Sequence, residues 1–215
     1  MNFSKKNIVF IILVGIFITN AIVAELTGGK LMGIGPFVVS VGILPWPIVF
    51  LTTDLMNEYF GKKGVKLITY ITAGLITYSY FVLYAGMKIN AVDFSPVDDN
   101  SFNIVFGQSQ WIIIGSIVAF IISQLIDIGM FWFFKKRTGD KMIWLRATGS
   151  TVVSQLFDSF IVAGIAFWMT GKVTFQEYIV MAISGYVVKL GIAILITPLI
   201  YAGHFGIKRY LKHEV

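Results

Sequence analysis

Residues 110–134, with the sequence QWIIIGSIVAFIISQLIDIGMFWFF, decide the class of fold. Asp127 is the one charged side chain in this stretch, which is long enough to cross a hydrocarbon core of about 30 Å as a helix. Inside lipid, only helices and closed barrels satisfy all their backbone hydrogen bonds. We therefore predict a transmembrane helix that carries one acidic group in its cytoplasmic half.

Five further apolar runs flank this segment, at residues 7–25, 36–57, 67–87, 148–170 and 177–203. The 215 residues have a mean hydropathy of +0.82, and only 13% of them are charged. This composition argues against a soluble enzyme, a disordered chain or a nucleic-acid-binding domain. The predicted fold is all-α, a polytopic membrane bundle of six transmembrane helices that forms a single transmembrane domain over residues 1–215.

The basic residues lie in short blocks between the apolar runs. Lys30, Lys88 and Lys172 fall on one side of the membrane, Lys189 falls inside the last run, and the remainder of the 17 Lys and Arg residues fall on the opposite side. Basic loops are retained in the cytoplasm. We expect a multi-pass protein of the bacterial cytoplasmic (inner) membrane with both termini in the cytoplasm. The longest external connection, residues 88–109, is either a solvated connector or a lid over the outer opening.

A phrase is repeated in the fourth and fifth runs: residues 123–127 read SQLID, and residues 154–158 read SQLFD. Gln and Asp are three apart in each phrase and therefore share a helix face. The two helices are expected to be antiparallel neighbours, so the two faces should meet inside the bundle. An ionisable group deep in a membrane helix costs about 2.5–3.5 kcal/mol on insertion scales, which favours a functional role for Asp127 and Asp158. We predict a polar cavity for a small hydrogen-bonding solute; alternatively, Gln and Ser side chains such as Ser154 clamp the helices together.

Two further polar residues lie inside apolar runs. Lys189 is either the counter-ion of one of these aspartates or a direct contact of the solute. Asn20, in the first run, serves either helix packing or solute binding.

The second run carries the motif Pro45-Trp46-Pro47, which is predicted to break or kink a helix in mid-membrane. A broken helix exposes backbone groups that can hold a solute, and the alternative is a simple kink. Trp46 and Phe50 either stack on a flat ring or pack against the core or lipid. Asp54 and Glu58, four apart, are predicted to pair with Arg146 or Lys62 as an inner gate; the alternative is a structural ion-pair network.

Several kinds of chemistry find no support in the sequence. There is no phosphate-binding loop, no H-E-x-x-H and no G-x-S-x-G motif. The two histidines have no metal-ligating partner at a useful spacing. We therefore expect neither an enzyme nor a cofactor or metal site.

Three motifs form an ordered set across most of the chain. They are residues 53–62 (TDLMNEYFGK), the phrase from Gln124 to Asp127, and residues 146–151 (RATGST) leading to Gln155 and Asp158. As a set they resemble the queuosine precursor transporters, a vitamin-uptake-like family of six-span bacterial membrane proteins. The resemblance implies uptake of 7-deazaguanine bases (7-cyano-7-deazaguanine, 7-aminomethyl-7-deazaguanine or queuine) for tRNA modification.

A purine-like base suits the polar residues, because its edge offers donors to a carboxylate and its carbonyl accepts from Gln or Ser. The predicted binding residues are Gln124, Asp127, Gln155, Asp158, Asn20, Trp46, Phe50, Ser154 and Lys189, and the predicted gate is Asp54, Glu58 and Arg146. Expected partners are the base and the lipid bilayer but no nucleic acid, with a proton as coupling ion and a homodimer as further options. The alternative function is the substrate-binding subunit of an energy-coupling-factor transporter, which needs a separate ATPase module; a membrane enzyme or scaffold is a third reading.

Overall fold

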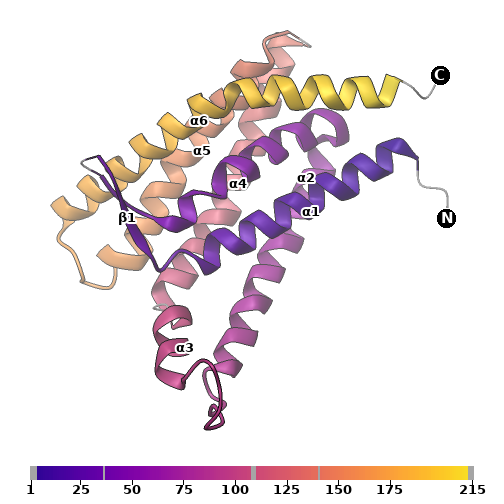
Figure 1. The fold of residues 1–215 in the computed structure, drawn as a ribbon. Helices are drawn as coiled ribbons and strands as arrows, with labels where there is room; N and C mark the ends of the chain where they lie inside the picture. The colour runs from indigo at the N-terminus through magenta and orange to yellow at the C-terminus, as the bar shows by residue number, and fades with distance from the viewer. Residues whose placement is uncertain (1–3, 36, 108–109, 140, 213–215) are drawn as a thin grey trace.

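The computed structural model describes residues 4–35, 37–107, 110–139 and 141–212. The elements are α1 (Lys5–Leu26), β1 (Leu31–Ile34), β2 (Phe37–Ser40), a 3₁₀ turn (Val41–Ile43), α2 (Trp46–Gly86), α3 (Asp99–Phe106), α4 (Gln110–Thr138), α5 (Ile143–Ala163), a π-helical turn (Gly164–Trp168) and α6 (Phe175–Lys212). The helices pack into a bundle with a small hairpin at its side (Figure 1). The predicted all-α membrane bundle is thus confirmed in its class.

Five stretches in the described part of the chain are long and apolar enough to cross a membrane, against six predicted. The difference arises in α2, which contains both the second and the third predicted runs. Gly61 interrupts α2 with φ 78° and ψ 168°, a backbone conformation that is essentially restricted to glycine. At this corner α2 turns back on itself (Figure 1). The two halves of α2 are separate segments, and the count of six spans stays a prediction.

The prediction of a mid-helix break at Pro45-Trp46-Pro47 is wrong. Pro45 caps the start of α2, and Pro47 lies in its first turn. Proline is tolerated there because the first backbone N–H groups of a helix have no partner within the helix. The prolines therefore begin α2, and the break lies about four turns later, at Gly61.

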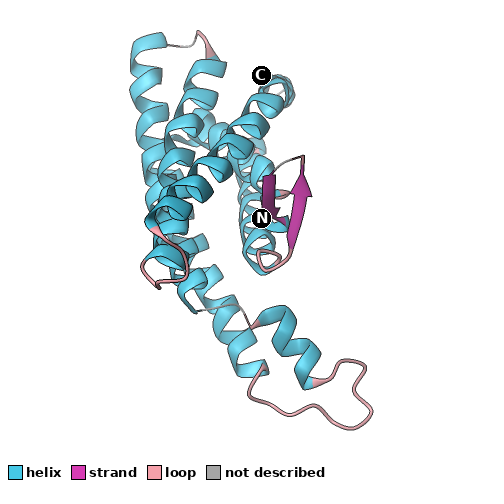
Figure 2. Ribbon diagram, turned by 90° about the vertical axis from the view of Figure 1, so that its left-hand side faces the viewer, coloured by secondary structure: helices cyan, strands magenta, loops and turns pink. Residues whose placement is uncertain are grey.

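The hairpin of β1 and β2 and the short helix α3 were not predicted. β1 and β2 form an antiparallel hairpin in which Leu31 pairs with Ser40 and Ile34 with Phe37, where the sequence predicted the start of the second span. The hairpin lies at one flank of the bundle, and α3 with the loop before it projects from the lower end of the bundle as drawn in Figure 2. The Asp98 carboxylate caps α3 by accepting from the Ser101 backbone N–H at 2.6 Å, and this bond lowers the pKa of Asp98.

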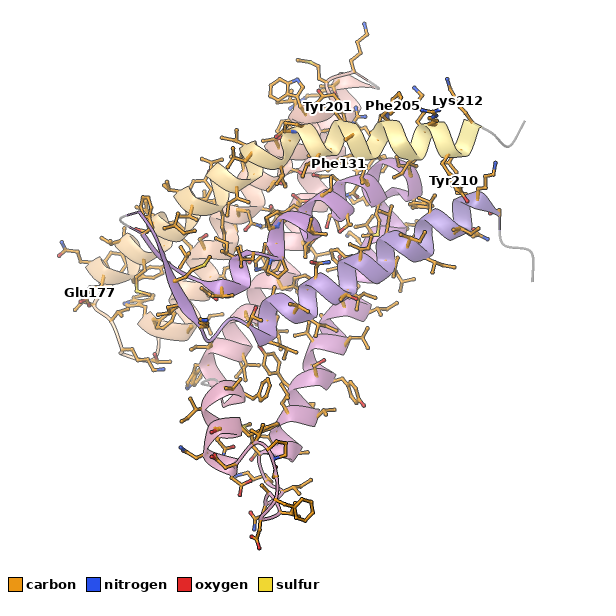
Figure 3. The ribbon with its side chains drawn as sticks, in the orientation of Figure 1. Phe131, Glu177, Tyr201, Phe205, Tyr210 and Lys212 are labelled. Carbon is orange, nitrogen blue, oxygen red and sulfur yellow. The ribbon has the colours of Figure 1, made fainter. Side chains whose placement is uncertain are left out.

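A buried apolar cluster joins α1, α2 and α4, and it includes Phe17, Met56, Ile76 and Phe120. The outer face of α6 is apolar but uncovered: Tyr201 and Phe205 point away from the bundle (Figure 3), with 46% and 66% of their surface exposed. Such a face is expected of a helix that contacts lipid. The start of α1 and the end of α6 lie on the same side of the molecule, opposite the hairpin (Figure 1).

Candidate functional site

The repeated phrases of α4 and α5 face each other and exchange hydrogen bonds. Ser123 Oγ on α4 donates to Asp158 Oδ1 on α5 at 3.3 Å, and Ser154 Oγ on α5 donates to Asp127 Oδ1 on α4 at 3.2 Å. All four side chains are buried. The prediction that the two polar faces meet inside the bundle is confirmed, and the two phrases are related by an approximate twofold exchange of serine and aspartate.

The two aspartates differ in their other partners. Asp158 Oδ2 forms an ion pair with Lys189 Nζ of α6. Of the two predicted roles of Lys189, the structure therefore shows that of a counter-ion. Asp127 instead accepts a second hydroxyl bond, from Thr151 Oγ1 at 3.5 Å. Lys189 therefore neutralises Asp158, whereas hydroxyl groups are the hydrogen-bond donors to Asp127.

Next to Asp127 lie polar groups whose bonding capacity is unused. Neither carboxylate oxygen of Asp54 has a hydrogen-bond partner among the described residues, and the same holds for Gln124 Oε1 and Asn57 Nδ2. Asp54 is only 3% exposed and interacts electrostatically with Asp127 across the α2–α4 contact. A buried polar atom left without a partner costs about 1–3 kcal/mol. Asp54 and Asn57 lie within one turn of α2, and Gln124 and Asp127 lie within one turn of α4. We call these four residues the Asp54 cluster.

One turn along α2 from Asp54, Glu58 is fully paired. Its Oε1 accepts from Arg146 at 2.8 Å and its Oε2 accepts from Lys135 at 3.1 Å. Arg146 is 1% exposed and also donates to the carbonyl oxygens of Gly139 at 2.8 Å and Lys141 at 3.1 Å. We call Glu58, Lys135 and Arg146 the Glu58 cluster. The predicted pairing of Glu58 with Arg146 is confirmed, whereas Asp54 is not hydrogen-bonded to this cluster and Lys62 is not a partner of Glu58.

The residues on either side of Glu58 reach two further helices. Asn57 Oδ1 accepts from Trp132 Nε1 of α4 at 3.2 Å. The Tyr59 hydroxyl lies 2.9 Å from His204 Nδ1 and donates to the His204 carbonyl of α6 at 3.0 Å. Residues 57–59 thus connect α2 to α4, α5 and α6, immediately before the Gly61 corner.

Sequence reasoning missed several of these partners. No role in the site was predicted for Trp132, and Lys135 was predicted only as one of the cytoplasmic basic residues. Lys135 lies two turns after Asp127 on α4, so the helical period alone places it on the face of the repeated phrase. Arg146 also lies near Phe131, whose ring centroid is 6.0 Å from the guanidinium carbon.

Three predicted binding residues do not contact the aspartates. Asn20 donates to the Ile16 carbonyl of its own helix at 2.8 Å. The rings of Trp46 and Phe50 stack on each other with centroids 5.6 Å apart, and Trp46 also packs on Phe120. These contacts correspond to the packing alternatives. In contrast, Glu25 of α1 is buried, accepts from the Tyr80 hydroxyl at 3.4 Å and interacts electrostatically with Asp158 and Lys189.

The polar residues at the centre of the bundle are closed to the outside. Asp54, Gln124, Asp127, Gln155 and Asp158 are each at most 5% exposed. A shallow hollow of about 490 Å³ lies far from them, against the start of α6, between Val173 and Met181. In this structure the aspartates are therefore covered by other parts of the chain.

Comparison with known proteins identifies the family. Residues 40–203 match the model of the family described as "Putative vitamin uptake transporter", and this range runs from the end of the hairpin into α6. The chain belongs to this vitamin uptake transporter family. It is accordingly a multi-pass membrane protein of a bacterial transporter family, which argues against an enzyme.

Two relatives carry the name "Probable queuosine precursor transporter", so the resemblance expected from the motifs is confirmed. The protein of Bacillus subtilis (strain 168) is 27% identical over 164 residues, which cover 76% of this chain and 70% of the relative. The protein of Haemophilus influenzae (strain ATCC 51907 / DSM 11121 / KW20 / Rd) is 26% identical over 160 residues, covering 72% of this chain and 63% of the relative, which is less than two thirds. No solved structure matches the chain described here.

Proposed function

We propose that this chain imports a 7-deazaguanine base, a queuosine precursor, across the bacterial cytoplasmic membrane. The observation that carries the proposal is the pair of Gln–Asp faces of α4 and α5, buried together and with unused bonding capacity at Gln124. A guanine-type edge has adjacent N–H donors that a carboxylate or an amide oxygen can accept, and its carbonyl accepts from an amide N–H. The names of the two relatives agree with such a solute.

In this proposal the base binds between α4 and α5. Gln124, Asp127, Gln155 and Asp158 supply its hydrogen bonds, with Ser154 orienting Asp127 and Lys189 holding Asp158. A site built on such bonds rejects analogues that lack the matching groups, because its own buried groups would then stay unpaired. Trp46 and Phe50 stack on the base once their mutual stack opens, and Asn20 joins them by leaving the Ile16 carbonyl.

The Glu58 cluster closes the cytoplasmic end of this path. Its salt bridges tie α2 to α4 and α5, so they must break before the base can leave on that side. The orientation follows from the distribution of basic residues, which places both termini in the cytoplasm. A proton gradient supplies the driving force, and Ala202 and Gly206, both exposed on α6, offer small-residue contacts for a homodimer.

The test uses cells that can neither synthesise the precursor nor import it. These cells express the chain and receive 7-cyano-7-deazaguanine, 7-aminomethyl-7-deazaguanine or queuine in separate cultures, and the queuosine content of their tRNA is measured. We expect one base to restore queuosine and thereby to identify its side group. If no base restores queuosine although the protein is in the membrane, the proposal of autonomous uptake is wrong. Restoration only together with an ATPase module would favour an energy-coupling-factor subunit instead.

A further inference from the structure

Four carboxylates of α2, α4 and α5 fall into two groups. Glu58 is paired with Arg146 and Lys135, and Asp158 is paired with Lys189. Asp54 and Asp127 form no ion pair with any described residue, although both are buried and interact with each other across the α2–α4 contact. The paired carboxylates have their countercharges, but this pair has none of its own.

Two of the three charged groups that act on Asp54 are acidic, and the one cation among them is shared with Glu58. The three groups are Asp127 from α4, Arg146 from α5 and Glu58 from its own helix. The Arg146 guanidinium is engaged by Glu58 and by two backbone carbonyls. Burial and a nearby like charge both disfavour the ionised form of a carboxylic acid, as in the pairs of carboxylates that share one site in some enzymes.

We propose that Asp54 and Asp127 form a proton-binding pair that couples uptake of the solute to entry of a proton. This inference rests on the proposed function, since it requires a solute that crosses the bundle. Asp127 joins the two sites: it shares a helix face with Gln124 and accepts from Ser154 of the base site, while it also faces Asp54. A base that contacts Asp127 therefore changes the environment of the proton.

The cycle moves one proton with the base. A carboxylate oxygen of the pair takes a proton from the external side, which leaves the pair with one negative charge when the helices close around the base. After the Glu58 cluster opens, the same oxygen releases the proton to the internal side. Net uptake requires this release, whereas exchange of one base for another across the membrane leaves the proton on the pair.

The experiment compares these two modes in proteoliposomes with the membrane potential clamped. The probe is labelled 7-cyano-7-deazaguanine, whose side group carries no charge, with the other two bases as alternatives. One pH unit, acid outside, corresponds to about a tenfold accumulation for one proton per base. We expect the wild type to accumulate the probe, Asp54→Asn to lose this gradient-driven accumulation, and base-for-base exchange by Asp54→Asn to persist. Asp93→Asn, an exposed acid outside the bundle, is the matched control and should behave as the wild type.

Gradient-driven accumulation by Asp54→Asn at the wild-type level would overturn the inference, as would uptake driven by a sodium gradient alone. If the Asp54→Asn protein does not reach the membrane, the same accumulation assay is made with Asp127→Asn. We expect its gradient-driven accumulation to disappear, and accumulation at the wild-type level would overturn the inference. Absence of uptake of all three bases by the wild type would overturn the proposed function itself.

A second measurement does not depend on the solute. The infrared carbonyl band of a protonated carboxylic acid should be present in the wild type at neutral pH and weaker in Asp54→Asn, but unchanged in Asp93→Asn. An Asp54→Asn protein with an undiminished band shows that the pair holds no shared proton. This result would overturn the inference even if the wild type imports the base.

Discussion

The Glu58 cluster and the Asp54 cluster lie one helical turn apart on α2, yet their bonding is opposite. Each carboxylate oxygen of Glu58 accepts from a cation, whereas neither oxygen of Asp54 accepts a hydrogen bond from a described residue. The first arrangement holds three helices together, and of its side-chain polar atoms only Arg146 Nε is buried without a partner among the described residues. The second contains hydrogen-bond donors and acceptors that have no partner among the described residues. The difference separates groups whose contacts stabilise the bundle from the groups that we propose to bind the proton and the base.

The largest effect is expected from Arg146→Ala, which breaks the Glu58 cluster. The change leaves Glu58 with Lys135 alone and leaves the Gly139 and Lys141 carbonyls without their donor. Removing one partner of a buried ion pair costs about 3–5 kcal/mol. Thermal unfolding in detergent should show a large destabilisation, and transport should fall more than binding. Lys135→Ala, at a 20% exposed side chain, should cost about 1 kcal/mol or less; equal losses for the two variants would contradict this ranking.

Asp158→Asn tests whether a paired carboxylate can also bind the solute. The change leaves Lys189 without its anion, and we expect uptake to be abolished while the amount of protein in the membrane is unchanged. The double variant Asp158→Asn with Lys189→Met removes both charges and should regain stability. If the double variant also regains uptake, Asp158 serves only as a counter-ion and does not contact the base.

Gln124→Met removes an unpaired group from the Asp54 cluster. Because Gln124 Oε1 has no partner among the described residues, the variant should be as stable as the wild type but defective in uptake. Ser123→Ala is the matched change one residue earlier, and it removes the bond to Asp158, with a cost of about 0.6 kcal/mol. A Gln124→Met protein that unfolds more readily than Ser123→Ala would show that the glutamine stabilises the bundle.

The smallest effect is expected at Asp98, a paired carboxylate outside the bundle. Its pKa is lowered by the backbone N–H of Ser101, so its cap stabilises α3 at pH values above about 4 and is lost as the pH falls through the lowered value. Hydrogen exchange of α3 should be faster in Asp98→Ala than in the wild type at neutral pH. The two proteins should become equal once the pH has fallen below the lowered pKa of Asp98. A difference that is independent of pH would exclude the carboxylate charge as its cause.

Much of this fold follows from the residues, and its failures have local causes. The apolar runs predicted the helices, and the repeated phrase predicted that α4 and α5 meet through Gln and Asp. The proline motif was misread because periodicity cannot distinguish the interior of a helix from its first turn. The corner at Gly61 depends on a single glycine conformation within a continuous helical pattern. The binding roles of Gln124, Gln155 and the aspartates stay predictions.

The partners of the Glu58 cluster could be predicted only in part. Arg146 was singled out with Glu58, but a choice among several cations depends on how far helices distant in sequence approach each other. The lack of partners at Asp54 could not be predicted, because a sequence lists polar groups without showing which of them are satisfied.

The anchoring of α2 also has a mechanical consequence. In the described residues, the side-chain hydrogen bonds from its first half to other helices come from Asn57, Glu58 and Tyr59, all next to the Gly61 corner. The opposite end, around Trp46, is held by ring packing, which tolerates sliding. This half of α2 is thus held by hydrogen bonds at the end near Gly61 and by ring packing at the end near Trp46. A movement of this half of α2 would therefore break fewer side-chain hydrogen bonds at the Trp46 end than at the Gly61 end.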